Sequence, residues 1–295
     1  MSQSREKPTR IKQTRPPVST YLPDHPTLQP YIDLDGRPQT LEFGELIKQD
    51  SFPIPMPVDR EGYLPDHDHR YWASGHTDWL NVQSAINELG VGPQTGNQKI
   101  RLLDIGCATG RVLRHVNVFG SGFEAYGSDL APANIAWMKR YLPAAIKATS
   151  NTTEARLDFP DNFFDVVTGF SFMPHLDEAE LDWLQELNRV THPNGILYLT
   201  IANDATWSIG AERESTFHHF NSVPGNQPFS KSTFTQPLPE DRIVRKMSTR
   251  SVYNCFVWHR DAFIESVWGK SVNVCRIADR AHLDYQSVLL ARPKK

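Results

Sequence analysis

The sequence predicts an α/β fold built on a doubly wound, mostly parallel sheet, and three observations support this. Apolar segments of strand length alternate with segments of helical periodicity between residues 100 and 201. A buried strand at 100–105 runs into a turn of small residues, 106–110, that opens a helix. The next strand ends in an acid, Asp129. Such alternation is typical of a parallel sheet with helices on both faces.

Each element follows from its own pattern. The predicted strands of the core are 100–105, 124–129, 164–170 and 196–201, and its predicted helices are 111–118, 133–141 and 177–190. The helix at 177–190 has an apolar stripe at helical spacing and a capping-box pattern formed by Asp177 and Glu180. Further along the chain, 261–268 is predicted as a helix, and 272–277 and 287–291 as strands.

The turn at 106–110 is the strongest functional signal. Gly106 and Gly110 allow backbone angles closed to other residues and let a ligand approach the main chain. Asp129 stands where an acid binds a ribose diol in nucleotide-binding sheets of this kind. Ala108 and Arg111 do not fit the glycine spacing of a dinucleotide site. The sequence therefore predicts a nucleoside cofactor and disfavours a nicotinamide dehydrogenase.

The pattern Asp-x-Gly-x-Ala-x-Gly at 104–110 resembles the first motif of class I S-adenosylmethionine (SAM) methyltransferases, which usually have glycine in place of Ala108. Segments 157–167 and 186–197 resemble later parts of that family in the same order, and 285–290 resembles its closing strand. The resemblance covers residues 99–204. It implies a Rossmann-like, seven-stranded sheet with an antiparallel last strand, and SAM as the cofactor.

The resemblance also implies where the cofactor lies. The main chain of Gly106, Cys107 and Ala108 should hold the amino-acid part of SAM. Asp129 should accept hydrogen bonds from both ribose hydroxyls, with Leu130 packing on adenine; a helix cap is the structural alternative for Asp129. Adenine's amino group should bind one of three polar residues that otherwise form a surface turn. These are Asn151, Thr152 and Thr153, and the predicted cofactor site also includes Asp104, Gly110 and Phe170.

The segment 66–75 contains alternating Asp and His residues, but no third metal ligand follows at a helical spacing. We therefore predict a solvated loop and no metal site. Its later part resembles a lid of bacterial small-molecule methyltransferases. Arg70 is a candidate to pair with the SAM carboxylate, and Tyr71 or Trp72 to pack near the sulfonium. A hydrophobic anchor for the N-terminal region is the alternative.

A methyl acceptor that is a hydroxyl benefits from a general base. His175 is the best-placed candidate because it follows the fourth strand, whose carboxyl end faces the cofactor in this fold. His218 and His219 are further candidates from the segment 205–252. For each histidine, a structural or solvated role is the alternative.

Composition limits the partners. The chain has 295 residues, 39% of them hydrophobic, and a net charge of −3, without the basic excess typical of nucleic-acid binding. No apolar run has the length of a membrane span, and the N-terminus lacks the apolar core of a signal peptide. Three widely spaced cysteines suit a reducing compartment. We expect a cytoplasmic protein that binds a small molecule, not nucleic acid or membrane.

The predicted organisation is as follows: a disordered basic tail at 1–20, an N-terminal cap at 21–98, a SAM-binding core at 99–204, an inserted substrate lid at 205–252, and the rest of the fold at 253–295. The predicted function is methyl transfer from SAM to a small molecule, with a hydroxyl of a sugar or secondary metabolite as acceptor. The alternatives are a SAM-binding regulatory or scaffold protein without turnover, and an N-methyltransferase.

Overall fold

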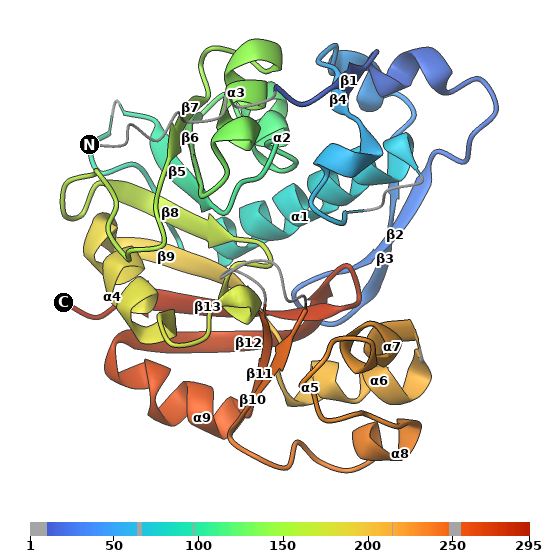
Figure 1. Cartoon of the computed structure of the whole chain (residues 1–295). Helices are drawn as coiled ribbons and strands as arrows, with labels where there is room; N and C mark the ends of the chain where they lie inside the picture. The colour runs from blue at the N-terminus through green and yellow to red at the C-terminus, as the bar shows by residue number, and fades with distance from the viewer. Residues whose placement is uncertain (1–10, 64–66, 97, 214, 248–254) are drawn as a thin grey trace, which may run out of the picture.

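The computed structural model describes residues 11–63, 67–96, 98–213, 215–247 and 255–295, and its centre is a seven-stranded sheet (Figure 1). The strand order is β12-β13-β9-β8-β5-β6-β7. β5 to β9 run parallel to one another, and β13 pairs antiparallel with both β9 and β12. The strands are β5 (Ile100–Ile105), β6 (Phe123–Asp129), β7 (Lys147–Ser150), β8 (Phe164–Gly169), β9 (Thr191–Ile201), β12 (Val272–His282) and β13 (Gln286–Pro293). The predicted Rossmann-like, doubly wound fold is confirmed.

Helices cover both faces of this sheet because neighbouring apolar residues of a strand point to opposite sides. Leu102 packs with residues of α1 (Asp68–Glu88), α2 (Leu113–Phe119) and α3 (Pro132–Tyr141). Leu103, the next residue, packs with α4 (Glu180–Val190) and α9 (Asp261–Ser266) on the other face. The near-continuous apolar run of β5 is thus buried on both sides.

Two details of the helices differ from the predictions. α1 begins at Asp68, so most of the segment 66–75, which was predicted as a solvated loop, is helical; Asp66 lies outside the described residues. α4 begins at Glu180, and no capping box forms there. The Glu180 carboxylate is instead 2.7 Å from Nε2 of His259 and 3.2 Å from Nε of Arg242. A tertiary ion-pair cluster has therefore replaced the local cap.

The described part of the N-terminal region begins at residue 11 and contains strands and short helices. β1 (Thr14–Arg15) pairs with β4 (Ile54–Pro55), and β2 (Leu28–Ile32) pairs with β3 (Pro38–Glu42). Short 3-10 helices lie at Val18–Tyr21, Ile47–Gln49 and Pro57–Asp59. Val18 is buried in one cluster with Phe43 and Trp72. The prediction of a disordered tail is therefore wrong for residues 11–20, and residues 1–10 lie outside the described part.

The segment 205–252 contains more structure than its polar composition suggested. It forms α5 (Asp204–Trp207), α6 (Ile209–Glu212), α7 (Ser215–Asn221), α8 (Lys231–Phe234) and β10 (Arg242–Lys246), which pairs with β11 (Cys255–His259). Its aromatic residues pack into a core of their own with Phe256 and Trp258 of β11. These aromatic residues are irregularly spaced, so no periodicity marked them as a core.

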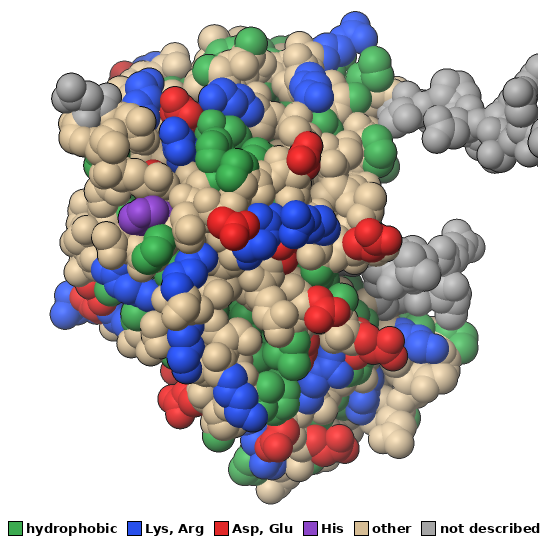
Figure 2. Space-filling view, turned by 90° about the vertical axis from the view of Figure 1, so that its left-hand side faces the viewer, with side chains coloured by type: hydrophobic (Ala, Val, Ile, Leu, Met, Phe, Trp, Pro, Cys, Tyr) green, Lys and Arg blue, Asp and Glu red, His purple; other side chains and the backbone are tan. Residues whose placement is uncertain are grey.

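Charged side chains of both signs lie among one another on the face shown in Figure 2, which accords with the small net charge. Within the described residues, no helix combines the length and the apolar character that crossing a membrane requires.

Two buried histidines join the N-terminal region to the core. Nδ1 of His76 on α1 lies 3.3 Å from Nδ1 of His115 on α2, and Trp72 stacks on His76. Burial lowers the pKa of His76 from 6.5 to about 4, and burial also lowers the pKa of His115. Both imidazoles are therefore neutral in the folded protein at neutral pH.

We expect acid to destabilise the protein through His76. Below pH 6.5 the unfolded chain binds a proton at this site that the folded chain rejects until about pH 4. The free energy of unfolding should fall by on the order of 2 kcal/mol at pH 5 from this group alone. Urea unfolding of the wild type and of His76→Gln between pH 7 and 4.5 measures it. Equal pH slopes for the two proteins would contradict the assignment.

Candidate functional site

A cavity of about 790 Å³ lies at the carboxyl ends of the central strands. Gly106, Asn151 and Phe170 directly follow β5, β7 and β8, and Asp129 ends β6. All four line the cavity, which matches the position of ligand sites in open α/β sheets. The N-terminal region adds Glu61 and Tyr63, the segment after β8 adds 171–172 and 175–179, and the β10–β11 hairpin adds Met247 and Cys255.

The turn after β5 approaches the cavity with its main chain. Gly106 has φ +69° and Ala108 has φ +48°, both in the left-handed region. The N–H groups of Gly106 and Cys107 donate to the Ser128 carbonyl, at 2.8 and 3.2 Å. The Ala108 N–H donates to Asp129 Oδ2 at 2.7 Å. The amides predicted to cradle the cofactor therefore already have partners within the protein.

Asp129 lines the cavity, as predicted for a ribose ligand, and also forms the helix-cap bond that was its structural alternative. Its side chain lines the cavity, while Oδ1 accepts from the Ala131 N–H at 2.8 Å and from Asn134 Nδ2 at 3.0 Å. Burial raises the pKa of Asp129, and the hydrogen bonds from Ala131, Asn134 and Ala108 oppose that rise. A carboxylate has about four acceptor positions. The bonds to the protein therefore leave Asp129 some capacity toward a ligand.

We expect Asp129→Ala to weaken SAM and S-adenosylhomocysteine (SAH) by on the order of 1 to 3 kcal/mol, through lost bonds to a buried diol. Calorimetry on the folded variant measures this. Asp165→Ala is the matched control, because that buried carboxylate also accepts a main-chain N–H, from Arg101 at 2.8 Å, near the opposite end of β8. Unchanged SAM affinity in Asp129→Ala would remove the ribose assignment.

The far side of the cavity fits a nucleoside. Leu130, Thr152 and Thr153 line it together with Asn134 and Asn151. Oδ1 of Asn134 and Oδ1 of Asn151 are buried and accept no hydrogen bond from any described residue. Buried acceptors without a partner favour a ligand that donates hydrogen bonds, and the amino group of adenine and the ribose hydroxyls are such donors. The residues present therefore fit the adenosine part of SAM.

Three residues predicted for the cofactor site are not among the described residues that line the cavity, and lie in the core next to it. Asp104 is buried and accepts from Thr168 Oγ1 at 2.9 Å, and burial raises its pKa to about 7. Cys107 packs in the core, with its sulfur 3.7 Å from that of Met138. A Cβ at Gly110 would lie 2.7 Å from Leu142, so this glycine permits close packing of the turn on α3 and the chain that follows it. Through these contacts, the three residues support the conformation of the turn at 106–110 and do not line the cavity themselves.

The residues of α1 predicted as a lid also lie outside the described lining of the cavity. Arg70 is exposed. The Tyr71 hydroxyl lies 3.3 Å from Thr109 Oγ1, and the Trp72 indole donates to Asp50 at 2.8 Å. Their packing corresponds to the alternative, a hydrophobic anchor. The described residues contain no cluster of three or more metal-ligating side chains.

Of the predicted bases, only His175 reaches the cavity. Its Nδ1 lies 2.7 Å from the Cys255 carbonyl oxygen, which can only accept, so Nδ1 carries the proton and Nε2 is the basic nitrogen. Burial lowers the pKa of His175, so the ring is neutral at neutral pH. His218 and His219 are exposed on α7, outside the described lining.

A known protein family matches the central part of the chain. Residues 103–199 match the methyltransferase domain family. Structures of similar fold include a magnesium protoporphyrin IX methyltransferase from Synechocystis PCC 6803 with bound SAH, at 15% identity over 77% of this chain and 87% of that chain, TM-score 0.48. Another is a SAM-dependent methyltransferase from Aquifex aeolicus, at 14% identity over 75% and 98%, TM-score 0.44. A comparison with curated protein sequences gives no match.

The seven-stranded sheet, the glycine turn and the match over residues 103–199 identify a methyltransferase domain at the centre of the chain. A domain of this kind indicates a methyltransferase that uses SAM as its cofactor.

Proposed function

We propose that this enzyme transfers the methyl group of SAM to a hydroxyl of a small molecule, such as a sugar or a secondary metabolite, with His175 as the base. The observation that carries the proposal is that His175 lines the same cavity as Gly106 and Asp129. A neutral imidazole with its basic nitrogen set by a bond at Nδ1 is suited to accept a hydroxyl proton.

The boundaries of the cavity support a small acceptor. The cavity is bordered by Tyr63 from the N-terminal region and by Met247 and Cys255 from the hairpin. Together with the strand ends of the sheet, three separate parts of the chain therefore enclose it. Among the described residues that line it there are acids but no Lys or Arg. Such a lining does not suit a polyanion, whose phosphates are usually bound by basic side chains.

Methyl transfer requires a methyl donor, a base for the hydroxyl proton, and walls that align the two reactants. SAM, when bound, supplies a methyl group on a sulfonium sulfur, which leaves as the thioether of SAH. Nε2 of His175 takes the acceptor's hydroxyl proton while the new C–O bond forms. The cavity walls align the acceptor with the methyl group and exclude water, which supplies much of the acceleration for such a displacement.

Incubating the protein with methyl-labelled SAM and a metabolite extract tests the proposal. We expect label in one or a few small molecules, in equal amount to the SAH formed. Mass spectrometry of the product separates O-methyl from N-methyl groups. Label only in nucleic acid or protein would contradict a small acceptor, and an N-methyl product would contradict the hydroxyl.

A further inference from the structure

SAM brings a carboxylate into this cavity, and the obvious donors for it are already occupied. The N–H groups of Gly106, Cys107 and Ala108 donate within the protein. No Lys or Arg is present among the described lining residues. A buried carboxylate without donors would be strongly disfavoured, so other groups must bind it.

Tyr63 is one donor that faces the cavity. Its side chain lines the cavity, and its buried hydroxyl makes no hydrogen bond of normal geometry to a described residue. Burial raises the pKa of Tyr63, which keeps the hydroxyl protonated, while the charge of Arg111 and a weak hydrogen bond with the Ser171 hydroxyl oppose that rise. A buried hydroxyl without a well-formed hydrogen bond costs free energy unless a ligand bonds to it.

Ser171 is a second donor, and its neighbours set its direction. Its Oγ accepts from Gln286 Nε2 at 2.8 Å, so its own hydrogen can be donated to the neighbouring Tyr63 hydroxyl or to a ligand. Gln286 is fixed in turn because its Oε1 accepts from Thr200 Oγ1 at 2.6 Å. Ser171 has φ +52°, an unusual conformation for serine that is held by its N–H bond to Thr200 Oγ1 at 2.7 Å.

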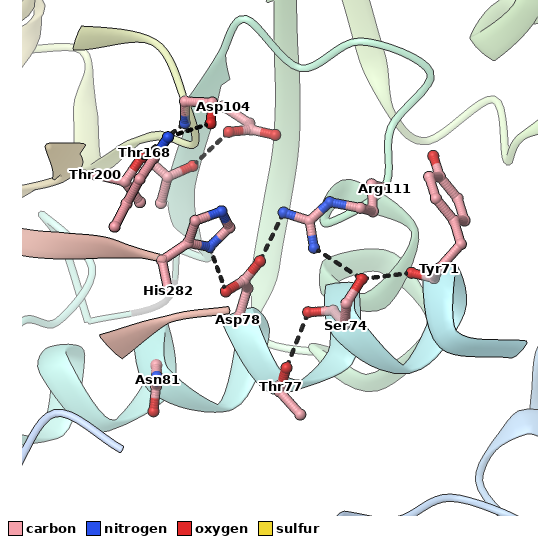
Figure 3. A network of polar contacts seen from close by, with 12 residues as sticks. Tyr71, Ser74, Thr77, Asp78, Asn81, Asp104, Arg111, Thr168, Thr200 and His282 are labelled. Atoms are coloured by element: carbon pink, nitrogen blue, oxygen red, sulfur yellow. Dashed lines mark hydrogen bonds and ion pairs between the residues drawn. The ribbon is translucent and has the colours of Figure 1, made fainter. Parts of the chain in front are cut away.

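A buried ion-pair network holds Tyr63 in place. The Arg111 guanidinium lies 4.3 Å from the centre of the Tyr63 ring and 5.6 Å from that of Phe170, another lining residue. Arg111 pairs with Asp78 at 2.6 Å, and Asp78 pairs with His282 at 2.9 Å. Figure 3 shows Arg111 and His282 on either side of the Asp78 carboxylate, between α1 and the end of β12. Arg111 is thus a positioning residue.

We infer that the hydroxyls of Tyr63 and Ser171 together bind the methionine carboxylate of SAM, in place of a cationic side chain. This inference rests on SAM binding in the cavity. It assigns to Tyr63 the role that the sequence suggested for Arg70, on the same N-terminal region but seven residues earlier. It also gives Arg111 a function, because the guanidinium links the ring of Tyr63 to the turn that follows β5.

The test compares SAH with its decarboxylated analogue, 5′-deoxy-5′-(3-aminopropylthio)adenosine, by calorimetry on the full chain. Tyr63→Phe keeps the ring over Arg111 and removes only the hydroxyl. We expect it to weaken SAH by about 10- to 100-fold, as for a lost hydrogen bond to a charged group, and to leave the analogue unchanged. Ser171→Ala should act in the same direction.

Tyr198→Phe is the matched control, because that hydroxyl is also buried without a well-formed hydrogen bond to a described residue but lies outside the cavity lining. It should not separate the two ligands. Equal loss of both ligands in Tyr63→Phe, or no loss of either, would overturn the inference. So would a raised KM for the acceptor with SAH affinity unchanged. If the wild type binds neither SAM nor SAH, the cofactor assignment itself fails, which is a different result.

Discussion

Gly106→Val is expected to abolish measurable SAM and SAH binding while the sheet stays folded. A Cβ at Gly106 would lie 3.3 Å from Phe172 on the cavity side, and valine adds two methyl groups beyond it. The backbone at φ +69° also disfavours a β-branched residue. Calorimetry with SAH and circular dichroism on the same sample measure binding and folding separately.

Gly90→Val is the control that separates the effect of backbone strain from the effect of blocking the cavity. Gly90 has φ +60°, follows the C-terminal end of α1, and has nothing within 4 Å of an added Cβ, so a substitution there carries the backbone penalty without touching the cavity. It should lower the thermal midpoint and leave SAH affinity unchanged. A folded Gly106→Val protein that binds SAH within a few-fold of the wild type would show that this turn does not hold the cofactor.

The sheet could be predicted because its signals are local. β5 and β8 are buried on both faces, so each appears in the sequence as a largely apolar run before a turn. β7 has the sequence Lys-Ala-Thr-Ser with only Ala148 buried, and no pattern marks such a short edge strand. The early turns of α1 were missed because Asp68, His69 and Arg70 look solvated. Their helical conformation is stabilised by residues far away in the sequence; Asp68, for example, forms an ion pair with Arg15 at 2.9 Å.

The part of the cavity formed by the strand ends could be predicted for the same reason. Gly106, Asp129 and Phe170 adjoin strand ends, so the topology alone brings them together. Tyr63 and Met247 reach the cavity from outside the core, and no spacing in the sequence predicts such a contact. One signal for Tyr63 was available. Arg111 stands where a dinucleotide site has glycine, and a cation there needs buried partners, which proved to be Asp78 and the Tyr63 ring.

Ala108 shows how the motif tolerates its departure from glycine. Its φ of +48° costs an alanine about 1 to 2 kcal/mol that a glycine avoids. The bond from its N–H to Asp129 Oδ2 offsets part of that cost, because a hydrogen bond to a charged group is stronger than a neutral one. The turn and the acid that ends β6 therefore hold each other in place.

His175→Ala is expected to lower kcat by about 100- to 10,000-fold, the usual effect of losing a general base, with SAH affinity within a few-fold of the wild type. Since burial lowers the pKa of His175, the basic form persists at neutral pH, so the wild-type rate should fall only as pH drops below about 6.5. That acid limb should be missing in His175→Ala.

His218→Ala and His219→Ala, on exposed α7, should leave kcat and its pH profile unchanged. Full turnover by His175→Ala would mean that alignment in the cavity suffices, and loss of turnover in either control would move the base to α7.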